Sequence, residues 1–341
     1  MTQTMMAREI AEIPAVTARQ LGEGLSAYRA IGKILRDRAP LFAATSARGT
    51  SDHAATYLKY LVETRLGLPV ASIGPSVASI YKAPLHLEQA ALFAVSQSGA
   101  SPDLLALLEA GRKSGAVTVA LLNAEGSPAA SVSEHVAPLL AGPEKAVAAS
   151  KSYVASLVAM AAIVAEWTGD EELMRALALL PDAFADALRC DWSAADEAFV
   201  AAESAYCLGR GPGLTIAAEA ALKFKETCAL HAEGFSSAEA MHGPLVLAGE
   251  GLKVLTFVPG DVARAGVIDT AQKMAQAGAD VWLVDQEQVE KNSLPAARAP
   301  HPALVAPVQA ASFYVFAERL SRLRGHDPDR PMHLKKVTET V

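Results

Sequence analysis

The stretch ALFAVSQSGASPDLLALLEAG, residues 91–111, passes from an apolar run into six small or polar residues and then into a helical pattern. The apolar run from Ala90 to Val95 is typical of a strand buried on both faces. Pro102 suits the first position of a helix that Ser101 caps. A strand, a short turn and a helix in this order predict one βαβ unit of a parallel sheet.

The same alternation continues along the 341-residue chain. In the first half, strand-like runs lie at 40–47, 69–74, 91–99, 117–123 and 136–140. A polar helical stretch over 170–204 follows. In the second half, strand-like runs lie at 205–211, 252–260, 280–286 and 303–307. "SARGTS" in the first half corresponds to "LGRGPGLT" in the second, which indicates a repeat. We therefore expect an α/β protein of two doubly wound domains, 1–191 with an N-terminal helical segment and 192–341, each with a mainly parallel five-stranded sheet flanked by helices.

Composition excludes several function classes. Hydrophobic residues make up 51% of the chain, charged residues 20%, and the net charge is −7, so no basic surplus is present to neutralise nucleic acid. The first residues do not follow the pattern of a signal peptide, and the apolar stretch 153–165 is shorter than the ~20 residues of a membrane span. The three cysteines lack metal-ligand spacing. We expect a cytoplasmic protein with neither nucleic acid nor membrane as partner.

Two hydroxyl-rich loops follow strands of the first half. "SQSGAS" (96–101) and "RGTSDHA" (48–54) each lead into a helix, whose N-terminal amides attract anions. Both loops lie at carboxyl ends of strands, where doubly wound sheets bind ligands, so together they suit one phosphate group. The alternative is that Ser101 only caps its helix in an ordinary turn, and that His53 faces solvent or supports the cap.

A dinucleotide cofactor is not expected. The fingerprint G-x-G-x-x-G followed by an acidic residue is missing from both loops. The nearest match, "GRGPGLT" in the second half, lacks the third glycine.

The densest polar segment is 217–244. Its Glu219, Lys223 and Glu226 are four and three residues apart and therefore share one helical face, which is equally the pattern of an exposed ladder of ion pairs. The loop-like sequence that follows, "HAEGFSSAEAMHGP", contains two histidines and two glutamates. His231 or His242 in it is either a core histidine that holds a loop or a functional group.

Several motifs in order give the chain a family resemblance from about residue 40 to its end. They are "GTSDHA", "SQSGASPDLL", "AVAASKSY" (146–153), "LGRGPGLTIAAEAALKFKETCALHAEGF", "AEAMHGPL" and "DPDRPMHLKKVTETV". The chain resembles the isomerase part of glucosamine-6-phosphate synthase, which consists of two sugar isomerase (SIS) domains. The resemblance implies two flavodoxin-like SIS domains and a homodimer with the site near the subunit interface.

Residue roles follow from the resemblance. It implies that the sugar phosphate is held by Thr50, Ser51, Ser96, Gln97, Ser98 and Ser101, with Ala149 beside them. Glu226 corresponds to the glutamate that moves a proton between C1 and C2, and Lys223 to a lysine that positions the substrate or intermediate. His242 corresponds to the histidine that assists ring opening, supplied by the other subunit, and Lys336 to the tail lysine that engages the ketose carbonyl. These residue types suit acid–base and carbonyl chemistry.

Departures from the synthase decide the expected reaction. "SQSGAS" replaces the usual "SQSGET", Ala149 replaces a serine in "VAASK", and the tail "HLKKVTET" has an extra lysine. The chain begins "MTQTMMARE" and leaves no room for a glutaminase domain, so glutamine is not expected as the ammonia source. We therefore expect a glucosamine-6-phosphate deaminase that yields fructose 6-phosphate and ammonia, with no metal and no organic cofactor.

Two alternatives stay open. One is a phosphosugar isomerase or deglycase that acts on another sugar or glycated-amine phosphate. The other is a SIS protein that binds a sugar phosphate without turnover, and the joint presence of Glu226, His242 and Lys336 favours catalysis over it.

Overall fold

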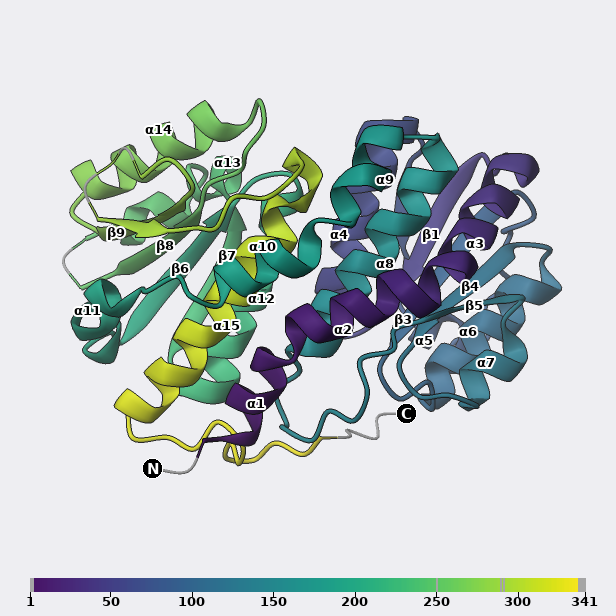
Figure 1. The fold of residues 1–341 in the computed structure, drawn as a ribbon, viewed down its shortest axis with the longest axis horizontal. Coiled ribbons are helices and arrows are strands. Elements are labelled where there is room, and N and C mark those ends of the chain that lie inside the picture. The colour runs from purple at the N-terminus through teal and green to yellow at the C-terminus, as the bar shows by residue number, and fades with distance from the viewer. Residues whose placement is uncertain (1–2, 250, 289, 291, 337–341) are drawn as a thin grey trace. The chain divides into compact units, whose positions relative to one another are not determined.

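The computed structural model describes residues 3–249, 251–288, 290 and 292–336. It contains two five-stranded sheets whose neighbouring strands are all parallel, in the orders β2-β1-β3-β4-β5 and β10-β9-β8-β6-β7 (Figure 1). Counted within each half, both orders are 2-1-3-4-5, the flavodoxin-like arrangement. The expected fold class and the repeated half are confirmed.

The first sheet is covered by helices on both faces. Leu92 packs toward α6 with Leu107, whereas its neighbour Phe93 lies 6.3 Å from the Trp167 ring of α8, because successive strand residues point to opposite faces. The elements of this half are α3 (Leu25–Arg38), β1 (Phe42–Ser46), α4 (Thr50–Leu66), β2 (Val70–Ser72), α5 (Ser76–Ser79), β3 (Ala90–Ser96), α6 (Pro102–Lys113), β4 (Val117–Leu122), α7 (Pro128–Val132), β5 (His135–Pro138) and α8 (Lys151–Thr168). Pro102 is the first residue of α6, as predicted.

The second sheet repeats this layering. Tyr206 and Leu208 of β6 pack with Met274 of α14, and Phe224 of α12 lies 5.3 Å from Phe313 of α15. The elements are β6 (Ser204–Gly209), α12 (Pro212–Cys228), β7 (His231–Ser236), α13 (Ser237–Ala240), the 3₁₀ helix η3 (Pro244–Leu247), β8 (Lys253–Phe257), α14 (Arg264–Gln276), β9 (Asp280–Asp285), β10 (Ser293–Pro295), the 3₁₀ helix η4 (Pro302–Leu304) and α15 (Val305–Leu323).

Contacts divide the chain into two compact units. The β1–β5 unit comprises Ala15–Glu144 and Lys151–Ala178. The β6–β10 unit comprises residues 3–14, Lys145–Ser150 and, among the described residues, Leu179–Lys336. Residues 179–191, expected in the first domain, therefore lie with the second sheet, where the Ser312 hydroxyl donates to the Ala187 carbonyl at 2.9 Å. The remaining helices are α1 (Met5–Ala11), α2 (Ile13–Arg19), the π-helix η1 (Gln20–Gly24), α9 (Glu171–Leu177), α10 (Leu180–Ala187), the 3₁₀ helix η2 (Ser193–Ala195) and α11 (Asp196–Val200).

Two sequence assignments in the second half are wrong. The loop expected after α12 begins with β7, which pairs with β6 along its whole length. The strand expected at 303–307 is the end of η4 and the first turn of α15. Pro307 is tolerated there because the first turn of a helix has no acceptor for its amides. The fifth strand of the sheet is β10, which is only three residues long.

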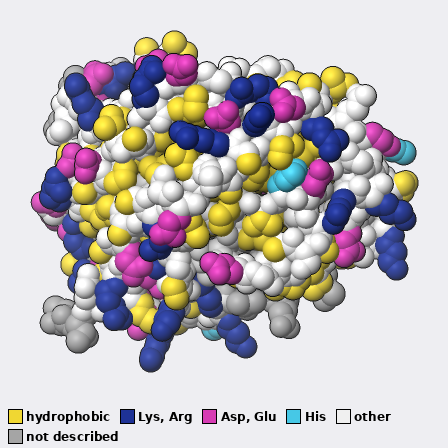
Figure 2. Space-filling view, turned by 45° about the vertical axis from the view of Figure 1, so that its right-hand side comes forward, with side chains coloured by type: hydrophobic (Ala, Val, Ile, Leu, Met, Phe, Trp, Pro, Cys, Tyr) yellow, Lys and Arg dark blue, Asp and Glu magenta, His cyan; other side chains and the backbone are white. Residues whose placement is uncertain are grey.

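The surface mixes both signs of charge. On the face drawn in Figure 2, basic and acidic side chains are interspersed. The apolar stretch 153–165 lies within the buried helix α8. Across the described residues, none of the helices combines the length and the apolar character needed to cross a bilayer.

Candidate functional site

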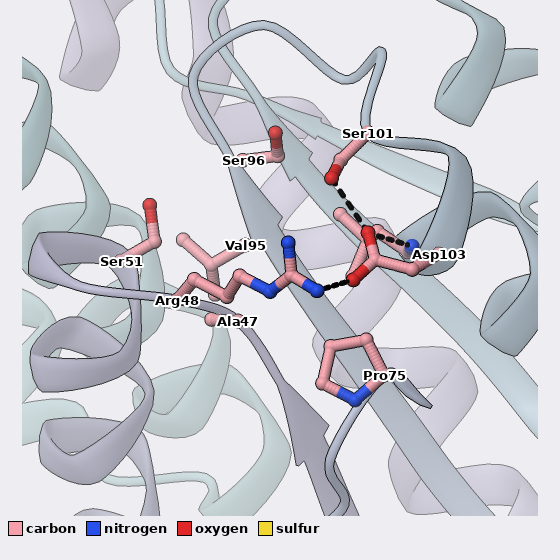
Figure 3. A pocket seen from close by; sticks show the side chains of 9 residues that line it. Ala47, Arg48, Ser51, Pro75, Val95, Ser96, Ser101 and Asp103 are labelled. Carbon is pink, nitrogen blue, oxygen red and sulfur yellow. Dashed lines mark hydrogen bonds and ion pairs between the residues drawn. The ribbon is translucent and has the colours of Figure 1, made fainter. Parts of the chain in front are cut away.

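A pocket opens in the β1–β5 unit where the chain leaves β1 and β3 (Figure 3). These two strands flank the switch in strand order, since their connections run to opposite sides of the sheet. The lining residues come from the two loops singled out in the sequence and from the adjacent strand and helix ends: Ala47, Arg48, Ser51, Pro75, Val95, Ser96, Ser101, Asp103 and Leu104. The structure therefore brings Ser51, Ser96 and Ser101 together in one pocket.

The first loop turns on a glycine. Gly49 has φ 54° and ψ −130°, a conformation that favours glycine, and it is the N-cap of α4. The Ser51 amide donates to the Arg48 carbonyl at 3.1 Å and the Asp52 amide to the Gly49 carbonyl at 2.9 Å, which starts the helix directly after the strand. Thr50 and Ser51 are half-buried in this first turn.

The second loop is shaped by its own serines. The Gly99 amide donates to Ser96 Oγ at 3.0 Å and the Ala100 amide to Ser98 Oγ at 3.4 Å. Gly99 has φ 60° and sits so close to Ser127 that a Cβ would lie 2.3 Å from its hydroxyl. The loop is therefore a fixed turn. Its Gln97 and Ser98 are half-buried but do not line the pocket.

The pocket also contains a charged pair, which the sequence did not lead us to expect beside the hydroxyl groups and the helix N-termini. Arg48 forms an ion pair with Asp103, and the Ser101 hydroxyl donates to the same carboxylate at 2.6 Å. Ser101 is the N-cap residue of α6, yet its hydroxyl accepts no helix amide and is turned to Asp103 instead. Both residues stand in the motifs "RGTS" and "SPD", but what brings them together is that β1 and β3 are neighbours in the sheet.

The second group of predicted residues lies on α12 in the β6–β10 unit. Lys223 Nζ lies 3.3 Å from Glu219 Oε1 and is hydrogen-bonded to Glu226, while the Tyr314 hydroxyl donates to Glu219 at 2.8 Å. Side chains of Glu219 and Lys223 are each 1% exposed, and that of Glu226 is 24% exposed. The ladder of exposed ion pairs is therefore ruled out, because two of its three members are buried.

The electrostatics of this cluster favour a charged lysine. Burial by itself lowers the pKa of Lys223, but the carboxylates of Glu219 and Glu226 outweigh it and raise the pKa above its ordinary value. A charged amine thus lies directly behind Glu226, the one of the two carboxylates that reaches the surface. Such an arrangement holds Glu226 in place and leaves its other oxygen available for proton transfer.

The remaining predicted residues are less enclosed. His242 is exposed in the turn after α13, where its amide donates to the Glu239 carbonyl at 2.9 Å. Lys336 is half-buried and is the last residue that the structure describes. Ala149 is half-buried in the segment Lys145–Ser150, which belongs to the β6–β10 unit rather than to the unit of the serine loops. His231 is exposed at the start of β7, so it is not a core histidine.

The fold and the pocket define a class: doubly wound α/β proteins with a hydroxyl-lined site at the switch point of the sheet. Comparison with known proteins makes the class specific. Residues 43–165 match the model of the SIS domain. A protein of Silicibacter pomeroyi DSS-3, provisionally named a phosphosugar isomerase, is 46% identical with a TM-score of 0.92, covering 96% of this chain and all of that one. The chain belongs to the SIS-domain family.

Two further relatives refine the comparison. Glutamine–fructose-6-phosphate aminotransferase (isomerizing) of Symbiobacterium thermophilum is 32% identical over 98% of this chain and 56% of the relative, so the chain spans little more than half of that protein. Glucosamine-6-phosphate deaminase of Thermotoga maritima matches 99% of this chain and all of its own with a TM-score of 0.79. At 18% identity, the second likeness concerns the fold alone.

Proposed function

We propose that this protein converts glucosamine 6-phosphate into fructose 6-phosphate and ammonia. The observation that carries the proposal is the partly exposed carboxylate of Glu226 on the buried amine of Lys223. A carboxylate held in this way suits a proton transfer between neighbouring carbons, which aldose–ketose conversion requires. The relatives named for amino-sugar phosphates and phosphosugar isomerisation support the choice of substrate class.

The phosphate group is assigned to the pocket of the β1–β5 unit. Hydroxyls of Ser51, Ser96 and Ser101 line it, and helix α6 begins directly beside them. Hydroxyl and amide donors bind phosphate oxygens without requiring a lysine. Thr50, Gln97, Ser98 and Ala149 remain predicted contacts of the substrate.

The chemical steps are assigned to the β6–β10 unit. His242 moves a proton between O1 and O5, which opens the ring to the aldehyde. Glu226 removes the proton from C2 while a proton of the C2 ammonium group passes to O1, which gives an enolamine. Glu226 then returns its proton to C1, so that C1 becomes a hydroxymethyl group and C2 an iminium carbon. Water adds to C2, the C2–N bond breaks, and ammonia leaves with fructose 6-phosphate. Lys336 is assigned to the new carbonyl oxygen and Lys223 to the placement of Glu226.

A homodimer belongs to the same proposal, as the resemblance implies. The exposed imidazole of His242 suits a site completed by a second subunit. Mixing inactive Glu226→Gln and His242→Ala chains should then restore part of the activity, because mixed dimers contain one site with both groups intact. Mixtures that stay as inactive as either variant would show that one subunit supplies both.

A second candidate is isomerisation of another sugar phosphate, and the 46% identity to the Silicibacter pomeroyi protein favours it. The two candidates differ in their products. Ammonia and fructose 6-phosphate should be measured over a panel of amino-sugar and neutral sugar phosphates. Turnover of a neutral sugar phosphate without ammonia release from glucosamine 6-phosphate would replace the deaminase with the isomerase.

The proton-transfer assignment is tested with Glu226→Gln. This variant keeps the shape of the side chain but loses the base, and turnover and exchange of the C2 hydrogen with solvent should fall about 10²–10⁴-fold while substrate still binds. Lys225→Gln, an exposed position on the same helix, is the matched control and should retain activity. Continued hydrogen exchange in Glu226→Gln would assign the proton transfer to another group.

A further inference from the structure

The buried end of the charged cluster on α12 is in contact with a hydroxyl group from another helix. Helices α12 and α15 pack against each other in the β6–β10 unit (Figure 1). Tyr314 of α15 is fully buried, and its hydroxyl donates to Oε1 of Glu219 at 2.8 Å. The proposed function gives tasks to Lys223 and Glu226 but none to this tyrosine. Tyr314 is therefore a buried polar group at the cluster whose part in the chemistry is not yet assigned.

Lys223 lies unevenly between its two carboxylates. Its Nζ is 3.3 Å from Oε1 of Glu219 and 2.5 Å from Oε2 of Glu226. The buried carboxylate of Glu219 would be expected to attract the ammonium group more strongly, because water screens a buried pair less than an exposed one. The ammonium group nevertheless lies closer to Glu226, which is 24% exposed. A further contact of Glu219 accounts for this order.

The hydroxyl of Tyr314 supplies that contact. It donates to Oε1 of Glu219, the same oxygen from which the 3.3 Å distance to Lys223 Nζ is measured. A hydrogen bond to a carboxylate oxygen stabilises part of its negative charge and occupies one of its lone pairs. Glu219 then attracts the ammonium group less strongly, and the ammonium group stays directed to Glu226.

We propose that Tyr314 is a positioning residue: by donating to Glu219, it directs the ammonium group of Lys223 to Glu226. Without the hydroxyl, Glu219 draws the ammonium group inward, and Glu226 loses part of the positive charge that favours its ionised form. The inference rests on the proposed function only in the use of Glu226 as the base. The placement of the ammonium group is independent of the substrate and of whether ammonia is released.

A double-mutant cycle in urea tests this placement without any substrate. Tyr314→Phe removes the hydroxyl and keeps the ring, which lies 5.9 Å from that of Phe313. Glu226→Gln removes the charge at the other end of the cluster. If the hydroxyl directs Lys223 to Glu226, loss of that charge should lower the urea midpoint less in the Tyr314→Phe background. The shift of the double variant should therefore be smaller than the sum of the two single shifts.

Ser312→Ala is the matched control for the cycle. Ser312 lies two residues before Tyr314 on α15 and is 1% exposed, but its hydroxyl donates to the Ala187 carbonyl of α10 at 2.9 Å. Its removal also loses a buried hydrogen bond, so the urea midpoint should fall, yet this effect should add to that of Glu226→Gln. Additive shifts for Tyr314→Phe as well would overturn the inference and leave Tyr314 as a structural contact.

The pH profile of kcat gives a second readout. With glucosamine 6-phosphate, the acid limb of the profile should move to higher pH by about half a unit to one unit in Tyr314→Phe, because Glu226 then lacks part of its stabilising charge. Ser312→Ala should keep the parent profile. An unshifted acid limb in Tyr314→Phe would overturn the inference. Hydrogen exchange at C2 that persists in Glu226→Gln would instead overturn the proposed function, and the urea cycle would still decide the placement of Lys223.

Discussion

Gly99 is the residue on which the shape of the serine loop depends. Its φ of 60° disfavours any side chain, and a Cβ would lie 2.3 Å from the hydroxyl and 2.8 Å from the Cβ of Ser127. Gly126 has φ 63° but has open space at the corresponding point.

Comparing the two glycines separates the cost of a side chain on a left-handed backbone from the cost of a steric clash with Ser127. Gly126→Ala should cost about 1–2 kcal/mol of the free energy of unfolding, from the left-handed backbone alone. Gly99→Ala should cost more, and should also weaken binding of fructose 6-phosphate, because the turn has to shift. Thermal unfolding measures the loss of stability in each variant, and calorimetry measures the affinity for fructose 6-phosphate. Equal losses of stability in the two variants would contradict the role given to Ser127.

The serines of the loop are not equivalent. Both hydroxyls accept an amide of the turn, Ser96 from Gly99 and Ser98 from Ala100, but only Ser96 lines the pocket. Ser96→Ala should weaken sugar-phosphate binding by roughly 1.5–3 kcal/mol, as for a lost hydrogen bond to a charged group. Ser98→Ala should weaken it less, by its effect on the turn. Titration with fructose 6-phosphate measures the affinity of both variants. Unchanged affinity in Ser96→Ala would contradict the assignment of the phosphate group to this loop.

Helix α12 shows why spacing alone was ambiguous. Glu219, Lys223 and Glu226 share a face in any helix, and the ion-pair ladder was a fair reading of that pattern. Burial decides between the readings, and it comes from α15, whose Tyr314 donates to Glu219 at 2.8 Å. That contact joins residues 95 positions apart in the chain, so no local pattern contains it.

Replacement of the buried amine tests this cluster. Lys223→Met removes the cation from beside the buried Glu219 and should lower the free energy of unfolding by about 3–5 kcal/mol. Adding Glu219→Gln should recover part of that loss, because the uncompensated charge is then gone. Urea unfolding of the single and double variants gives the comparison, and a double variant less stable than the single one would argue against a charge effect.

The raised pKa of Lys223 sets the pH window of this effect. A lysine whose pKa is raised on folding contributes stability that is complete below its ordinary pKa of 10.5 and is lost as the pH rises through the folded value. The stability difference between the parent and Lys223→Met should therefore stay constant from neutral pH up to about pH 10 and narrow above it.

Strand β7 was expected to be a loop, because its sequence does not follow a strand pattern, and contacts with the rest of the fold make it a strand. Its "HAEGFS" lacks the alternation of a strand, and Gly234 in its middle is typical of a turn. The glycine is required because α12 passes so close that a Cβ would lie 2.7 Å from the Cα of Ala218. The strand forms because β6 offers it a parallel partner along six residues.

At the scale of the whole molecule, each of the two units is built from separate segments of the chain. Helix α1 and the segment Lys145–Ser150 belong to the unit of the second sheet, although the first sheet is built from the residues between them. Glu9, 5% exposed, ties these two segments together by accepting the backbone amides of Lys145 and Ala146.

This link predicts a local effect on the segment that carries Ala149. Glu9→Ala leaves amide donors without their acceptor and should cost about 1–3 kcal/mol. Glu9→Gln keeps an acceptor and should cost less, and the exposed Glu23→Ala is the control. Hydrogen exchange at the Ala146 amide should accelerate in Glu9→Ala only, and unchanged exchange would show that the segment is held elsewhere.

The sequence by itself determined the two parallel sheets, the repeated half, the two serine loops and the start of α6 at Pro102, because each depends on short-range periodicity, capping or turn chemistry. Only the tertiary structure decided that Arg48 meets Asp103, that Glu219 and Lys223 are buried, and that residues 179–191 lie with the second sheet. These outcomes depend on which strands become neighbours and which helix covers which face. Such pairings join residues far apart in the chain, where charge and spacing carry no information about the partner.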